Sequence, residues 1–135
     1  MAGGAGVTKE PATDRFAARF HAAGYSVLAF DHRHFGESGG TPRQVARISE
    51  QLADWEAALD CAASLPGVAV GKIAGWGFSL AGGHLLRLAA RPQNEHRLAA
   101  VIAQAPLTDG AVSARGELTA PSASGACAIT AARRC

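Results

Sequence analysis

Hydrophobic positions in the first third of the chain follow a helical period and then a short continuous run. Thr13 and Asp14 are candidate helix caps, and Phe16, Phe20 and Ala23 then recur at helical spacing, which predicts a helix over 13–23. The apolar run over 25–30 contains aromatic and branched side chains, as is typical of a strand buried on both faces. The pattern therefore opens with a helix followed by a buried strand.

The same alternation continues to about residue 104. Apolar side chains at helical spacing predict an amphipathic helix over 44–64: Ile48, Leu52, Trp55, Leu59 and Ala62. Two further apolar runs predict strands over 72–78 and 98–104, with a helix over 80–91 between them. Alternating helices and apolar strands favour an α/β fold, a parallel sheet with helices on both faces.

The periodic pattern ends near residue 110. Ala, Ser, Thr, Gly and Arg dominate the stretch over 111–135, which has neither a helical nor a strand period. We therefore expect one domain over 1–110 and an irregular, disordered tail over 111–135.

Composition excludes several classes of protein. A hydrophobic content of 48% with 18% charged residues is that of an ordinary globular chain. The net charge of +2 comes from acidic and basic residues mixed along the sequence, so no basic stripe is available for nucleic acid. No apolar stretch is long enough to span a membrane and no secretion signal is recognisable, so the expected location is cytoplasmic.

The three cysteines show no metal or disulfide pattern. Cys61, Cys127 and Cys135 include no C-x-x-C pair and lack a histidine at zinc-finger spacing. We expect neither a metal nor an organic cofactor, and the sequence does not indicate an oligomeric state.

One serine lies where a predicted strand runs directly into a predicted helix. A serine at such a sharp turn presents its hydroxyl as a nucleophile if small residues let strand and helix approach each other. Gly77 and Ala81 stand two positions on either side of Ser79. The backbone N–H of Leu80, at the start of the helix, would then point toward an oxyanion formed during acyl transfer.

Two other interpretations of this turn remain open. Ser79 is also suited to cap the helix that begins at Leu80. Gly75 and Gly77 resemble the start of a dinucleotide-binding G-x-G-x-x-G motif, but Leu80 stands where its third glycine belongs, which argues against nucleotide binding.

Together, two segments resemble the α/β-hydrolase family over about residues 3–110. The loop at 31–38 has the form D-x-R-x-x-G-x-S, and the segment at 77–84 has the nucleophile elbow G-x-S-x-G with alanine as the last small residue. The resemblance implies that Ser79 is the nucleophile. Arg33 and Ser38 are expected to hold the loop by hydrogen bonds rather than to take part in chemistry.

The N-terminal segment is similar to the oxyanion loop of that family. Gly3 stands in place of a histidine, and the N–H of Ala5 would be the second oxyanion donor beside that of Leu80. The resemblance further implies a central strand between those at 25–30 and 72–78. Since the match begins at Met1, the sequence predicts a truncated domain that lacks this strand.

The family's later catalytic residues are not identifiable. Its chain order is Ser, then Asp or Glu, then His, and His84 and His96 are the histidines after Ser79. His84 should project from the helix away from the serine, and His96 should lie at the opposite end of the sheet. Asp109 is a weak candidate for the acid, with an Asp-Gly turn as the simpler alternative.

The remaining histidines come before the serine and out of the family's order, so surface or loop-packing roles are expected: His21, His32 and His34.

The resemblance implies a serine hydrolase that cleaves a small-molecule ester, thioester or amide through an acyl-enzyme on Ser79. The alternative is a truncated, non-catalytic hydrolase fragment without turnover, because a serine without its histidine retains only a small part of the rate enhancement.

Overall fold

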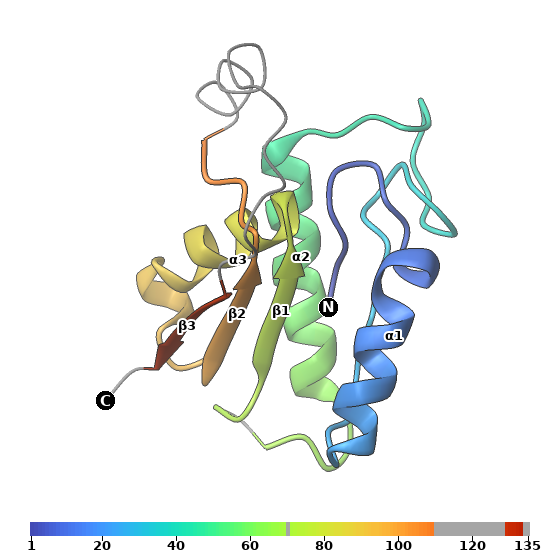
Figure 1. Ribbon diagram of the computed structural model, residues 1–135. Coiled ribbons are helices and arrows are strands. Elements are labelled where there is room, and N and C mark those ends of the chain that lie inside the picture. Colours follow the sequence, from blue (N-terminus) through green and yellow to red (C-terminus); the bar gives the residue numbers. More distant parts are fainter. Residues whose placement is uncertain (70, 110–128, 134–135) are drawn as a thin grey trace, which may run out of the picture.

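The computed structural model describes residues 1–69, 71–109 and 129–133, and in this part of the chain the sheet has three strands (Figure 1). β1 (Ala74–Phe78) and β2 (Ala100–Gln104) are parallel, with their first residues paired with each other and likewise their last. β3 (Ile129–Arg133) runs antiparallel on the other edge of β2. The parallel β1–β2 pair confirms the predicted strands, each shortened by two residues at its start.

Four helical segments accompany the sheet: α1 (Lys9–Ala22), α2 (Ile48–Ser64), α3 (Leu80–Ala89) and the short 3-10 helix η1 (Pro92–Asn94). All three predicted helices are present with shifted ends. α1 begins four residues earlier than expected because Thr13 does not cap it. Instead, the buried Thr13 hydroxyl donates a hydrogen bond back to the Lys9 carbonyl, inside the helix.

Helices cover both faces of β1, as predicted. Side chains alternate between the two faces of a strand. A Cβ added at Gly75 would contact Leu85, and one added at Gly77 would contact Ala81, so this face of β1 lies against α3. The intervening Trp76 lies against Phe16 of α1, with ring centroids 4.7 Å apart.

The hydrophobic core lies between the sheet and the α2–α3 pair. It combines side chains from α2, α3 and β2 with Ala2 and Leu98: Leu52, Trp55, Leu59, Ala81, Leu85, Leu88, Val101 and Ala103. A fully buried leucine contributes about 1.5–3 kcal/mol relative to an exposed one. Of the α1 side chains that the structure describes, in contrast, only Thr13 is buried.

The prediction of a buried strand over 25–30 was wrong. This segment is assigned no strand, and none of its residues is buried. Its backbone meets the sheet through Met1, whose amino group donates to the Leu28 carbonyl at 2.6 Å and whose carbonyl accepts from the Phe30 N–H at 3.2 Å. A strand needs such pairing along its length, and here the pairing is confined to one end.

Met1 and Ala2 lie between the segment over 25–30 and β1. Ala2 forms a parallel bridge to Gly77, and its N–H donates to the Trp76 carbonyl at 3.3 Å. These two residues therefore occupy the position at which the resemblance implied a central strand.

The irregular tail expected over 111–135 falls largely outside the described residues. Within it, the structure differs from the expectation at 129–133, which form β3 along the free edge of β2. No helix in the described part of the chain is long and apolar enough to cross a membrane.

Candidate active site

Ser79 lies in the turn between β1 and α3, as the sequence predicted. Its backbone has φ 53° and ψ −117°, a strained conformation for a residue other than glycine. The Ser79 N–H donates to the Gln104 carbonyl at 2.9 Å, and the Ser79 carbonyl accepts from the N–H groups of Gly83 and Leu107 at 3.1 and 2.9 Å. Hydrogen bonds from three segments therefore hold this turn.

Three glycines make the turn sterically possible. A Cβ at Gly77 would lie 2.6 Å from the carbonyl group of Ala81, which is backbone and cannot move aside. A Cβ at Gly82 or Gly83 would collide with the Gly77 carbonyl or with the Leu107 carbonyl, respectively. The sequence argument used Gly77 and Ala81 but missed the Gly82-Gly83 pair, which lets the segment after β2 cross the start of α3.

The Ser79 side chain does not cap α3. Although Ser79 holds the N-cap position, it forms no side-chain cap hydrogen bond, so the capping interpretation is not supported. A Cβ built on Gly4 would lie 3.3 Å from the Ser79 Cβ and 3.7 Å from its Oγ. The N-terminal loop thus passes directly against the serine.

The two predicted oxyanion donors are the backbone N–H groups of Leu80 and Ala5. Leu80 is the first residue of α3, where a backbone N–H has no acceptor within the helix. Ala5 follows Gly4, the residue that packs on Ser79, and is itself exposed. Leu80 therefore directly follows Ser79 in the chain, and Ala5 directly follows the glycine that packs on Ser79.

Asp109 lies beyond β2 on the segment that reaches the serine turn. Its side chain is exposed, and the same segment is tied to Ser79 through the Leu107 N–H. The fold therefore brings the segment around Asp109 to the carboxyl end of the strands, which is also the end where Ser79 lies.

The histidines engage other groups. His84 is buried, and its Nε2 lies 2.9 Å from Oε1 of Gln51 on α2. His34 Nε2 lies 3.2 Å from a carboxylate oxygen of Glu50. His21 and His96 are exposed, the first in the last turn of α1 and the second between η1 and β2.

His32, in the loop at 31–38, and His84 of α3 form a buried pair. Their ring centroids are 6.1 Å apart. Burial, together with the nearby His32 and Arg87, lowers the pKa of His84 to about 4. Burial also lowers the pKa of His32, opposed by the Asp54 carboxylate 3.4 Å from its Nδ1. Both rings are therefore held neutral near pH 7.

The loop at 31–38 is held by its own side chains, as the sequence suggested. Arg33 donates from Nε to Asp54 at 2.7 Å, and the Ser38 hydroxyl donates to the Asp31 carbonyl at 2.7 Å. Burial raises the pKa of the Asp31 carboxyl, but hydrogen bonds from the Lys9 and Glu37 backbone and from the Lys9 ammonium group outweigh it. The net effect lowers the pKa of Asp31.

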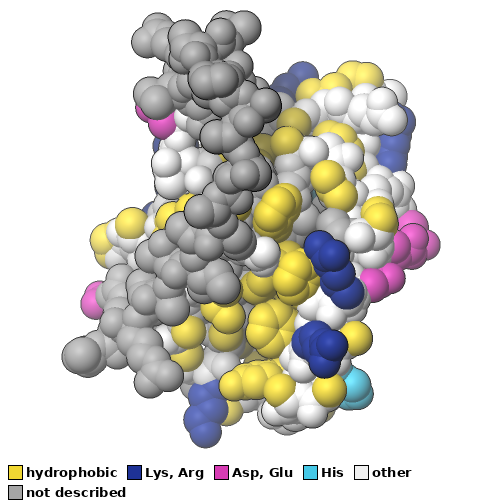
Figure 2. Space-filling view, viewed as in Figure 1, with side chains coloured by type: hydrophobic (Ala, Val, Ile, Leu, Met, Phe, Trp, Pro, Cys, Tyr) yellow, Lys and Arg dark blue, Asp and Glu magenta, His cyan; other side chains and the backbone are white. Residues whose placement is uncertain are grey.

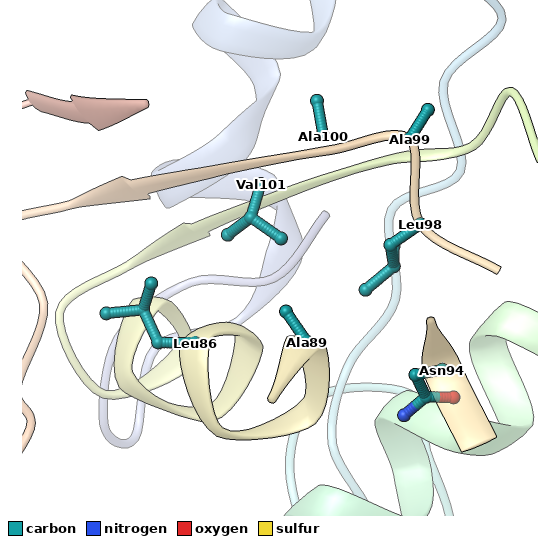
Figure 3. Close-up of a pocket in the computed structure, with 7 residues that line it drawn as sticks. All are labelled: Leu86, Ala89, Asn94, Leu98, Ala99, Ala100 and Val101. Atoms are coloured by element: carbon teal, nitrogen blue, oxygen red, sulfur yellow. The ribbon is translucent and has the colours of Figure 1, made fainter. Parts of the chain in front are cut away.

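A small apolar cavity lies away from the serine turn, between α3 and the start of β2 (Figure 3). Its volume of about 60 Å³ is enough for about two water molecules. Among the described residues, no three His, Cys, Asp or Glu side chains are grouped so as to hold a metal ion.

Comparisons with known proteins agree with this geometry. A family model described as serine aminopeptidase, S33, matches residues 9–133. Over 110 residues the chain is 49% identical to the quorum-quenching protein AidA of Acinetobacter baumannii, covering 82% of this chain and 35% of AidA. Over 82 residues it is 38% identical to the thiohydrolase aneE of Aspergillus aculeatus, covering 61% of this chain and 26% of aneE.

The fold has a solved counterpart. The crystal structure of hypothetical protein PA2218 from Pseudomonas aeruginosa superposes with a TM-score of 0.67 at 36% identity, covering 74% of this chain and 30% of PA2218. The chain thus spans about a third of the length of these relatives.

Proposed function

Because this chain belongs to the serine aminopeptidase S33 family of α/β-hydrolases, we propose that Ser79 is the nucleophile of a serine hydrolase. The observation that carries the proposal is the strained turn itself. It places a serine with no cap hydrogen bond between a buried strand and a helix N-terminus. Strain of this kind is retained where function requires it.

The proposed reaction follows from the groups around the turn. Ser79 Oγ attacks the carbonyl carbon of an ester, thioester or amide and gives up its proton to a base. The N–H groups of Leu80 and Ala5 stabilise the oxyanion of the tetrahedral intermediate. The leaving group departs with a proton and leaves an acyl-enzyme, which water hydrolyses.

Among the described residues, we identify no histidine placed to act as the base for Ser79. All five histidines lie among the described residues, and the contacts described above direct three of them to α2 while two are exposed. Asp109 remains the acid candidate, and it would need a histidine to act on Ser79. We therefore propose that these 135 residues are a partial hydrolase domain, consistent with their covering 35% of AidA.

The proposed substrate is a small acyl compound. The name of one relative, a thiohydrolase, supports a thioester as one such substrate. The proposed reaction uses no cofactor, because each of its roles falls to a serine, backbone N–H groups or a base.

Labelling with a fluorophosphonate tests the proposal on the 135-residue chain. Such reagents phosphonylate serines that are presented as nucleophiles, and peptide mass spectrometry identifies the modified residue. We expect slow modification of Ser79, no modification in Ser79→Ala, and unchanged modification in Ser38→Ala, a loop serine that serves as control. Modification of other serines at the same rate would contradict the assignment.

The rate of p-nitrophenyl acetate hydrolysis distinguishes a serine without a base from a complete catalytic site. Without a base, the chain should hydrolyse the ester at or near the background rate, and Ser79→Ala should not change that rate. Robust turnover that depends on Ser79 would show that a base is in place, and His32, His34 and His84 would then be replaced one at a time.

A further inference from the structure

A second cleft opens beside the N-terminal loop. Its volume is about 540 Å³, within the range of roughly 300–1,000 Å³ common for small-molecule sites. One wall belongs to the N-terminal loop and the other to the segment between the predicted strand over 25–30 and α2. The lining residues are Ala5, Gly6, Thr8, His34, Phe35, Gly36, Gln44 and Ala46.

The cleft begins next to the residue that packs on Ser79. Gly4 lies against Ser79, and the two residues that follow, Ala5 and Gly6, form part of the cleft wall. A substrate whose carbonyl carbon reaches Ser79 would therefore have its remaining atoms within reach of this cleft.

Ion pairs and hydrogen bonds connect and order the two walls. The Lys9 N–H donates to Asp31 at 2.6 Å, and the Lys9 ammonium group pairs with both Asp31 and Glu37. Arg43 donates to the carbonyls of Gly36 and Ser38. A site that is already ordered loses less entropy when a ligand binds.

Two residues on one wall have unusual backbone conformations. His34 and Gln44 have positive φ angles of 71° and 59°, and the Gln44 N–H donates to the His34 carbonyl at 2.9 Å. His34 is buried, and its Nδ1 has no hydrogen-bond partner in the described structure. Strained, over-determined residues of this kind cluster at ligand-binding sites.

The lining favours an uncharged ligand. None of the eight lining residues is Asp, Glu, Lys or Arg, and the charged side chains around the cleft are paired with one another or with carbonyl groups. His34, the titratable lining residue, already contacts Glu50. A buried charge without a partner is costly, whereas Thr8 and Gln44 offer neutral hydrogen-bonding groups beside the apolar Phe35 and Ala46.

We propose that this cleft binds the uncharged part of the acyl substrate, a short apolar segment that carries a neutral hydrogen-bonding group such as an amide. The substrate role rests on the proposed function of Ser79. Binding of such a group to the cleft does not require the serine to react.

Three probes that share the same butyl group test the charge preference by NMR: N-butylacetamide, butylammonium and pentanoate. We expect the neutral amide to shift the backbone signals of Ala5, Gly6 and Gly36, and the two ions to leave them unchanged. Equal binding of either ion, or no shift at these residues with the amide, would overturn the proposal.

Two variants test the location. Ala46→Phe should fill part of the cleft and weaken binding about tenfold or more, while the same substitution at the exposed Ala57 of α2 should leave it unchanged. Thr8→Val removes a hydroxyl that makes no cap hydrogen bond to α1, and it should weaken binding with little effect on folding. Unchanged binding in both cleft variants would place the site elsewhere.

The Ser79→Ala variant distinguishes this proposal from the proposed function. It should bind N-butylacetamide as the parent chain does, because Ser79 does not line the cleft. If the fluorophosphonate labels Ser79 but N-butylacetamide does not bind the cleft, the cleft proposal alone would be overturned. A cleft that binds while Ser79 resists the fluorophosphonate would overturn the serine mechanism and the substrate role, and leave a ligand site.

Discussion

The two edges of β1 differ in how they are supported. On one edge all five residues of β1 pair with β2, and α3 packs closely on the face formed by Gly75 and Gly77. On the other edge the contacts come through Met1 and Ala2, and the extended segment over 25–30 beyond them has no buried residue.

This difference shows what the serine turn requires. Every hydrogen bond that holds the Ser79 backbone comes from β2, from α3 or from the segment after β2, all on the well-packed side. The turn is therefore fully formed although the opposite edge of β1 is bridged by Ala2 rather than paired with a full strand.

Apolar surface is also exposed near the edge of β1 that Ala2 bridges. Figure 2 shows hydrophobic side chains gathered over β1 and beside α1 on this face of the molecule. Tyr25 and Phe78 are 61% and 39% exposed. The contribution of an apolar residue to stability grows with the surface that it buries, so these two contribute less than fully buried aromatic residues.

The largest expected effect comes from breaking the close approach of β1 and α3. Gly77→Ala places a Cβ 2.6 Å from backbone atoms of Ala81, and it should lower the free energy of unfolding by about 3 kcal/mol or more. Gly39→Ala is the control, because a Cβ there meets open space, and its effect should stay within about 0.5 kcal/mol. Urea unfolding of both variants measures the difference, and equal stabilities would contradict the packed turn.

Acid should weaken the packed side through His84. The pKa of this side chain is about 4 in the folded chain and about 6.5 when exposed, so the unfolded chain binds more protons between these values. Its contribution is fully present above pH 6.5 and is lost as the pH falls toward 4. The free energy of unfolding should therefore fall by up to about 3 kcal/mol across that window.

His84→Gln tests this origin of the pH dependence. Glutamine stays neutral and can still donate to Gln51, so the slope between pH 4 and 6.5 should become smaller, with the remainder due in part to His32. The exposed His96→Gln is the control and should leave the slope unchanged. A slope that survives His84→Gln in full would contradict the assignment.

A matched pair of valines compares the two edges directly. Val101 of β2 is 5% exposed and belongs to the core, whereas Val27 is only partly buried. Val101→Ala should lower the free energy of unfolding by about 2 kcal/mol and Val27→Ala by less than about 1 kcal/mol. Equal losses at the two positions would show that both edges are packed alike.

Local patterns were sufficient to predict the elements on the packed side. α2, β1, α3 and β2 each carry an apolar period or run that is buried in the structure, and Ser79 falls between β1 and α3 as expected. The segment over 25–30 has an equally apolar run, but pairing depends on a partner distant in the sequence, which no local pattern reveals. The run alone therefore predicted a strand that the structure does not contain.

Long-range contacts also limited the prediction of the site. The start of α1 was misplaced because Thr13 was taken for a cap, whereas its hydroxyl bonds to Lys9 within the helix. The need for a small residue at Gly83 arises from Leu107, more than twenty positions further along. The contact between the His32 and His84 rings likewise depends on how α2 and α3 pack.

The central claim is that Ser79 is positioned as a nucleophile but has no base in this chain. Imidazole added to the solution can supply the missing base, so the most direct measurement is the rate of fluorophosphonate labelling at Ser79 with and without imidazole. We predict a rise of about tenfold or more with imidazole and no labelling at this position in Ser79→Ala. Fast labelling of Ser79 that does not depend on imidazole, or no labelling of Ser79 under either condition, would contradict the claim.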